Sequence, residues 1–232
     1  MFGLRNVSAR HIIVTVAILN FIMVVVGYIG HDNPTKHYRE GTIGTHISIL
    51  LLALIALVNF QIFLRQKHVI WLLISLGFAF LAFDEGFEIH EGLDKAFHRY
   101  FGISQTSLTD RIDDILIGIY GLIGAGILYR FRAEILRYKV LLQYLLPGFA
   151  FLAASVVFDA VTNDNALFLW AGIPETYVLD VKLPLRALEE VSKLMAEAIF
   201  LAGFVQVFRQ VKADGDHTAG KPLDESASRP VK

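Results

Sequence analysis

The chain has 232 residues, of which 55% are hydrophobic, and its mean hydropathy is +0.54. These values are too apolar for an ordinary soluble domain and favour a protein that is embedded in a lipid bilayer. The net charge of −1 excludes a basic surface for nucleic acid, and the absence of cysteine excludes disulfide bonds and thiolate metal ligands.

The apolar residues form long blocks that are separated by polar segments. Six blocks are long enough to cross a membrane, which predicts an all-α, polytopic integral membrane bundle. The predicted transmembrane helices cover about 12–30, 42–64, 69–91, 112–129, 140–161 and 185–208. Residues 1–211 then form one six-helix domain, and the polar residues 212–232 form a disordered tail.

The segments between these helices also contain sequence patterns that predict their structure. Within 92–111, apolar residues at helical spacing predict a piece that lies along the membrane surface. The segment 162–186 is polar and is predicted to be a long connection. Three glycines on the fourth helix are expected to let another helix approach closely: Gly118, Gly121 and Gly124.

The distribution of Lys and Arg predicts the orientation. With six spans, one side of the membrane receives thirteen basic residues and the other side receives seven. The richer side contains both termini and the short basic segments 65–68 and 130–139. Because cytoplasmic loops are enriched in Lys and Arg, both termini are predicted in the cytoplasm of a cell with an inner membrane.

The third predicted helix ends in a dense group of ionisable residues. The fifteen residues 69–83 carry no charge and rise only about 22 Å, less than a hydrocarbon core of about 30 Å. Asp84 is therefore expected inside the bilayer, where an ionisable group is costly and by default indicates a functional site. On a continuous helix, Asp84, Glu88 and Glu91 share one face, and His90 points away from it.

The last predicted helix carries a second polar face, which includes Glu190, Lys193 and Glu197. Counting inward from the cytoplasmic end places Glu197 near the middle of the bilayer and Lys193 level with Asp84. Asp114 on the fourth helix lies at a similar depth. Polar faces at matching depth are expected to face each other, because neither can face lipid.

Ordinary structural roles explain part of this pattern. Four carboxylates begin their helices, where the positive end of the helix dipole stabilises them: Asp113, Asp114, Glu189 and Glu190. Lys193 lies four residues from both Glu189 and Glu197, so it can simply neutralise its neighbours. Asp84, Glu88 and Glu197 have no such explanation.

The cluster holds many more acids than cations, so it is expected to be partly protonated or to bind a divalent metal ion. The predicted metal ligands are Asp84, Glu88, Glu91, Glu190 and Glu197. His90 and Asp114 are predicted as a further ligand or as the catalytic general base. Oxygen ligands with imidazole suit Mn, Fe, Zn or Ca, and the residues alone do not distinguish these metals.

Two stretches resemble a group of uncharacterised bacterial polytopic inner-membrane proteins. Asp84-Glu85 and His90-Glu91 match a pattern like DExxxxHE at the end of one helix. Leu188-Glu189-Glu190 matches the start of an LEExxE pattern on the last helix, although Lys193 stands where the pattern has a carboxylate, and Glu197 follows one turn later. The resemblance implies a site within an inner-membrane protein and implies no known activity.

Three functions are consistent with these features. The first is a metal-dependent membrane enzyme whose lipid-like substrate reaches the site laterally from the bilayer. The second is a carrier for protons or metal ions that uses Glu197 and Lys193 as a relay, although the cytoplasmic halves of the helices are nearly all apolar. The third is a structural or accessory subunit of a membrane complex, in which the polar cluster is a salt-bridge network.

Overall fold

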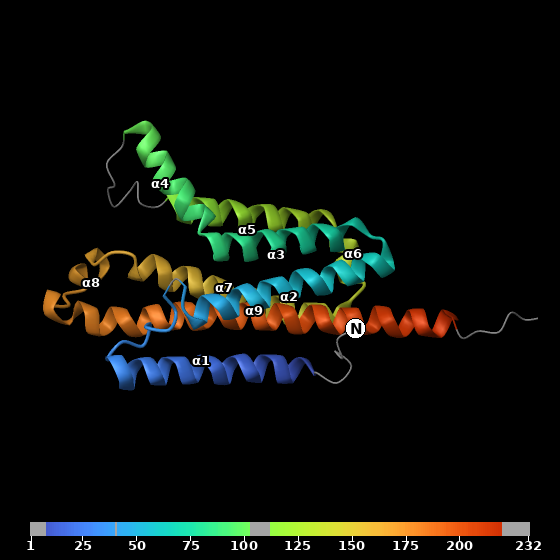
Figure 1. Cartoon of the computed structure of the whole chain (residues 1–232), viewed down its shortest axis with the longest axis horizontal. Coiled ribbons are helices and arrows are strands. Elements are labelled where there is room, and N and C mark those ends of the chain that lie inside the picture. Colours follow the sequence, from blue (N-terminus) through green and yellow to red (C-terminus); the bar gives the residue numbers. More distant parts are fainter. Residues whose placement is uncertain (1–7, 40, 103–111, 220–232) are drawn as a thin grey trace, which may run out of the picture.

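The computed structural model describes residues 8–39, 41–102 and 112–219, and all regular structure within these residues is α-helical (Figure 1). The helices in chain order are α1 (Ala9–His31), α2 (Ile43–Gln66), α3 (Val69–Phe87), α4 (Ile89–Phe101), α5 (Ile112–Arg130), α6 (Arg132–Leu136), α7 (Lys139–Thr162), α8 (Ala166–Trp170) and α9 (Glu175–Ala219). The all-α prediction is therefore confirmed for the described part of the chain.

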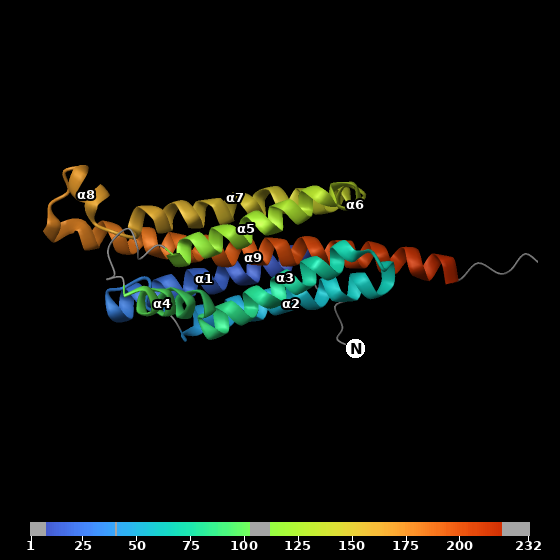
Figure 2. The ribbon, with the colours of Figure 1, turned by 90° about the horizontal axis from the view of Figure 1, so that it is seen from above.

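The central element is α9, which packs most extensively against α7 and then against α2 and α1. Seen from above, α9 runs between α7 on one side and α2 and α3 on the other (Figure 2). Of the most apolar stretch of α9, 72% is buried inside the structure, compared with 22% for α1. The last helix of the chain is therefore the core around which the earlier helices pack.

Two glycines allow α7 and α9 to approach closely. A Cβ atom at Gly148 of α7 would collide with the ring of Phe200, and a Cβ atom at Gly203 of α9 would lie 2.7 Å from Cβ of Tyr144. Small residues at such positions let helix backbones come into contact. The prediction for Gly118, Gly121 and Gly124 of α5 is wrong in this respect, because nothing among the described residues lies within 4 Å of a Cβ placed at any of the four glycines of this helix.

The third helix is shorter than predicted. It ends at Phe87, because Glu88 adopts a left-handed conformation with φ of 51°, and α4 starts at Ile89 in a new direction away from the bundle (Figure 1). The prediction that Asp84, Glu88 and Glu91 share one helix face is therefore wrong. The chain turns out of the bundle at Glu88, after Asp84 and Glu85, and the helical spacing within 92–111 belongs to α4 up to Phe101.

The last helix is longer than predicted. It begins at Glu175, continues through Pro184 and ends at Ala219. The predicted long connection 162–186 therefore contains α8 and the first part of α9. Lys182 Nζ of α9 donates to Oδ1 of Asn165, the residue before α8, at 3.0 Å. The predicted disordered tail is helical from 212 to 219, and residues 220–232 lie outside the described residues.

The connection between α1 and α2 folds back into the bundle instead of lying outside it. Asn33 N–H donates to the carbonyl of Gly27 at 3.2 Å, and Gly27 has no side chain that would obstruct this approach. Gly44 N–H donates to the carbonyl of His37 at 2.8 Å. These contacts bury Tyr38, which is 5% exposed, among the helices.

Five helices of the described chain are long and apolar enough to cross a membrane, namely α1, α2, α3, α7 and α9. They correspond to five of the six predicted spans, although their ends differ. The fourth predicted span, 112–129, coincides with α5. The side chains of 112–117 lie outside the described residues, so the sixth span stays a prediction.

Candidate functional site

Polar side chains of α9 lie inside the bundle over about two helical turns. Glu190, Lys193 and Glu197 recur at intervals of three and four residues, so they occupy one face of the helix. Lys193 contacts α3, and Glu197 contacts α2. The expectation that the polar ends of the third and last helices face each other is confirmed by the contact between Glu85 and Lys193.

An ion pair in this region joins α3 to α9. Lys193 Nζ donates to both carboxylate oxygens of Glu85, at 2.8 and 2.9 Å. Both side chains are mostly buried, with 34% of Lys193 and 20% of Glu85 exposed. A pair of this kind neutralises two charges that would otherwise be costly in an apolar interior. The sequence predicted that Lys193 neutralises Glu189 or Glu197. In the structure its ammonium group is instead hydrogen-bonded to Glu85.

Glu197 is only half satisfied. Its Oε1 accepts a hydrogen bond from Ser48 Oγ at 2.8 Å, and the residue is 7% exposed. Its Oε2 is buried and has no hydrogen-bond partner among the residues that the structure describes. A carboxyl group in this position is expected to be protonated or to be neutralised by a cation, because burying an uncompensated charge is very costly.

Further hydrogen bonds tie the cluster to the end of α7. Thr162 Oγ1 donates to Glu189 Oε2 at 3.5 Å, and Arg186 donates to the Thr162 carbonyl at 3.5 Å. Asp159 of α7 lies within electrostatic range of both Glu189 and Glu190. The cluster is thus shared among α2, α3, α7 and α9, and it contains more carboxylates than cations.

Tyr38 connects the cluster to α1. Its hydroxyl lies 2.9 Å from Asn20 Oδ1 and 3.2 Å from the Asn20 carbonyl. Burial, and then the negative charge of Glu190, raise the pKa of Tyr38 above its ordinary value. Tyr38 therefore remains a neutral hydroxyl at physiological pH, hydrogen-bonded to Asn20 and within electrostatic range of Glu190.

The predicted site residues divide into three groups. Glu190 and Glu197 lie in the cluster, and Asp84 is buried at the end of α3 with 5% exposure. Glu88 is half-buried at the break between α3 and α4. The backbones of three others belong to α4 and α5, and their side chains lie outside the described residues: His90, Glu91 and Asp114.

The predicted metal site is not assembled by the described side chains. Among them, no group of three or more His, Asp or Glu residues is arranged to hold a metal ion. Glu190 and Glu197 are nearly two turns apart along α9, with Lys193 between them, which disfavours a shared cation at both carboxylates. A ligand set that uses His90, Glu91 or Asp114 stays a prediction.

Sequence reasoning missed the hydrogen-bonding neutral residues. Ser48, Thr162 and Tyr38 each contact a carboxylate or lie beside one, yet each stands in a segment without a distinctive motif. The signal available in the sequence was for Ser48, because it follows Thr45 and His46 in a group of polar residues at the start of a largely apolar helix.

The model of one protein family matches residues 12–208, which is most of the chain and includes the whole cluster. The chain belongs to the DUF8692 family. This family is described as a domain of unknown function, so membership names no activity. No curated protein and no solved structure shows a significant match to the chain. The DUF8692 match begins within α1 and ends within α9, so it treats the helices around the cluster as one domain.

Proposed function

We propose that the protein is an integral membrane protein of the cell inner membrane, with six spans and both termini in the cytoplasm. The five long apolar helices support this proposal. Large apolar side chains cover the outside of the bundle, including Phe21 at 69%, Leu122 at 74% and Leu146 at 74% exposure. Such a surface suits the lipid bilayer as the surrounding partner.

We infer that the function depends on the uptake of a cation by the acidic cluster of α9, with Glu197 as the acceptor. The observation that carries this inference is the buried Glu197 Oε2, which has no partner within the described residues, while Lys193 is occupied by Glu85. The cation is a proton or a metal ion, since either one neutralises a buried carboxylate.

The surroundings of Glu197 favour a site over a passage through the membrane. Beyond Glu197, the next turns of α9 are buried and apolar, as shown by Phe200, Phe204 and Val205. No polar side chain continues the path of Glu190, Lys193 and Glu197 within the following turns, up to Val205. A cation that reaches Glu197 therefore returns to the side from which it came, which disfavours the carrier.

More specifically, we propose that the protein is a metal-dependent enzyme that acts on a lipid-like substrate. It is supported by the excess of carboxylates over cations around α9 and by the buried Asp84 next to Glu85. Asp84, Glu88, Glu91, Glu190 and Glu197 remain the proposed ligands, and His90 and Asp114 the proposed catalytic groups. The accessory-subunit role applies if the cluster takes up neither a proton nor a metal.

Elemental analysis of the protein purified in detergent tests the nature of the cation, with Glu197→Gln and Glu190→Gln as variants. Glu134→Gln is the matched control, because Glu134 of α6 pairs with the exposed Arg137 outside the cluster. A bound metal near one per chain that is lost in both variants supports the enzyme. The absence of metal, together with a higher thermal stability of Glu197→Gln, supports a proton on Glu197. Absence of metal with a large loss of stability in Glu197→Gln would contradict the inference.

A further inference from the structure

One end of the bundle carries a basic surface that the acidic cluster does not use. Three segments form it, and they lie at the same end of the molecule (Figures 1 and 2): the turn 65–68 between α2 and α3, the segment 130–139 that contains α6, and 208–214 of α9. His68 Nε2 lies 3.6 Å from Glu134 Oε1, and the guanidinium of Arg65 lies over the ring of Phe208 at 5.6 Å from its centre. The three segments therefore form one surface, which we call the basic end.

The charge of the basic end is strongly unbalanced. Its three segments contain eight Lys and Arg residues but two carboxylates, those of Glu134 and Asp214. The opposite end is nearly balanced, with six Lys and Arg residues and seven Asp and Glu residues in its described segments 31–39, 88–101 and 163–186. Glu134 is already paired with Arg137, at 3.0 Å. The basic end therefore keeps an excess of cations that the chain itself does not neutralise within these segments.

Two arginines at the corner between α5 and α6 are the most informative members of this surface. Arg130 lies over the ring of Phe131, at 5.4 Å, and Arg132 lies over the ring of Tyr129, at 4.6 Å. Arg132 also donates to the Tyr129 carbonyl at 3.1 Å. Both arginines are exposed, and neither is paired with a carboxylate among the residues that the structure describes. Because a guanidinium has five N–H donors, both retain donors for an anion.

Exposed apolar side chains lie next to these cations. Tyr129 in the last turn of α5 is 70% exposed, Leu136 of α6 is 51% exposed, and Leu64 in the last turn of α2 is 47% exposed. The helix α2 is one of those long and apolar enough to cross a membrane, and the basic end begins where it ends. Tyrosine and basic residues at the end of such helices are typical of the level of the lipid headgroups.

We propose that the basic end binds anionic phospholipids, with the lipid phosphate between Arg130 and Arg132 and an acyl chain along Tyr129 and Leu136. The excess of cations selects an anionic headgroup over a zwitterionic one, whose own ammonium group cancels the charge of its phosphate. An acidic soluble protein satisfies the cations but leaves the apolar side chains beside them in water. The proposal rests on the membrane location, and it does not require cation uptake at Glu197.

Thermal unfolding of the full chain in a nonionic detergent, during titration with dioctanoyl phosphatidylglycerol, tests the proposal. The Tm is expected to rise and saturate, because a ligand that binds only the folded state stabilises it. Dioctanoyl phosphatidylcholine is expected to bind at least about fivefold more weakly. The same loss of affinity for phosphatidylglycerol is expected in Arg130→Gln/Arg132→Gln, because two guanidinium contacts to the phosphate are removed.

The matched control is Arg39→Gln/Arg99→Gln. It removes the same charge from two exposed arginines at the opposite end, so its affinity for phosphatidylglycerol is expected to equal that of the wild type. If Arg130→Gln/Arg132→Gln unfolds because the bond to the Tyr129 carbonyl is lost, Lys67→Gln/Lys139→Gln serves as the second variant. These two exposed lysines of the basic end donate no side-chain hydrogen bond within the described chain, and their loss is expected to weaken binding at least about twofold.

Four results would overturn the proposal. They are equal affinity for the two phospholipids, equal affinity in the wild type and the basic-end variants, equal stabilisation by inorganic phosphate, and equal stabilisation by polyglutamate. The third would assign the surface to free anions, and the fourth to an acidic protein. Glu197→Gln is expected to bind phosphatidylglycerol as the wild type does, so failure of the lipid site and failure of the cation site give different results.

Discussion

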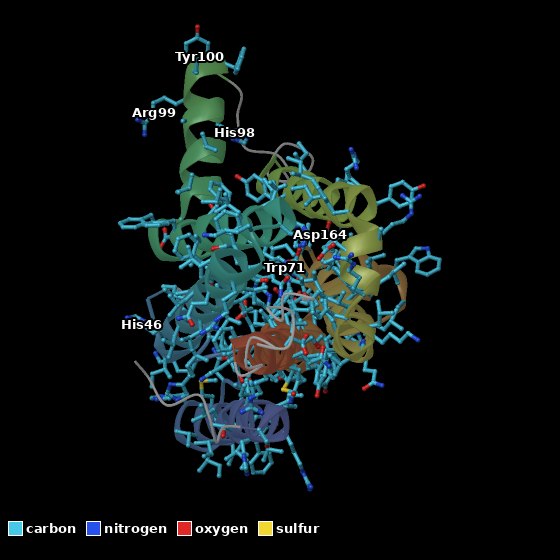
Figure 3. The ribbon with its side chains drawn as sticks, turned by 90° about the vertical axis from the view of Figure 1, so that its right-hand side faces the viewer. His46, Trp71, His98, Arg99, Tyr100 and Asp164 are labelled. Carbon is cyan, nitrogen blue, oxygen red and sulfur yellow. The ribbon has the colours of Figure 1, made fainter. Side chains whose placement is uncertain are left out.

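The surroundings of α9 and the helix α5 differ in how closely their polar and small residues are packed against other helices. Around α9, every element that touches the cluster contributes a partner, and glycines bring α7 and α9 into direct contact. In α5, the glycines face open space, and neighbouring side chains such as Leu122 are 74% exposed. The view along the bundle shows a further contrast, with Trp71 of α3 inside the bundle and Arg99 and Tyr100 of α4 outside it (Figure 3). A glycine pattern alone therefore does not identify the helices that pack closely.

The largest expected effect comes from breaking the ion pair in the packed region. Lys193→Met leaves Glu85 without its counter-charge and is expected to lower the free energy of unfolding by about 2–4 kcal/mol. This range is below that of a fully buried pair, because 34% of the lysine side chain is exposed. Thermal unfolding in detergent measures it. The double variant Glu85→Gln/Lys193→Met should recover part of the loss, and a double variant as unstable as Lys193→Met would contradict the pairing.

The glycines offer a direct comparison of the two regions. Gly148→Ala places a methyl group against the ring of Phe200 and is expected to cost about 1–3 kcal/mol. Gly121→Ala introduces the same atoms into open space and should be neutral, or stabilising by up to about 1 kcal/mol through helix propensity. Thermal unfolding of the two variants side by side is the measurement. Destabilisation of Gly121→Ala to the same extent would show that α5 packs as tightly as α7.

A serine in the packed region tests the hydrogen bond to the cluster. Ser48→Ala removes the described donor to Glu197 and is expected to cost about 1–3 kcal/mol. Ser75→Ala is the matched control, because Ser75 Oγ donates only to the Ala56 carbonyl, and a cost of about 1 kcal/mol or less is expected. The two Tm values provide the comparison. A larger loss in Ser75→Ala would mean that Ser48 does not support the cluster.

The smallest effect is expected on the projecting helix α4. Tyr100 is 84% exposed near the end of this helix. Tyr100→Ser is therefore expected to change the free energy of unfolding by no more than about 0.5 kcal/mol. The measurement is again the Tm in detergent. A shift comparable to that of Gly148→Ala would place α4 within the cooperative core.

The sequence was sufficient for the helical class and for five of the long helices, because an apolar run of about twenty residues has a single physical solution in lipid. The sequence also predicted that the polar end of the third helix faces the last helix, which the contact between Glu85 and Lys193 confirms. The ends of the helices were harder to predict from the sequence. Glu88 ends α3 through a left-handed backbone conformation, and no sequence motif predicts this conformation. Pro184 lies inside α9, although a proline usually indicates a helix boundary.

The details of the site depended on tertiary contacts. The spacing of Lys193 relative to Glu189 and Glu197 predicted a neutralising role within one helix, whereas the structure pairs it with Glu85, which is 108 residues away in sequence. The folding of 32–39 back against Gly27 brings Tyr38 to Asn20, and neither residue has a local signal for this contact. Pairing between helices follows from how they pack, which a single sequence does not encode in its periodicity.

Infrared spectroscopy of the carboxyl region, compared between the wild type and Glu197→Gln, tests the central claim most directly. The claim is that Glu197 holds a proton or a metal ion, since Lys193 is paired with Glu85. The predicted difference is the loss of a protonated carboxyl band, or of a carboxylate band that shifts when metal is removed. Loss of an ordinary ionised carboxylate band that responds neither to pH near neutrality nor to metal removal would contradict the claim.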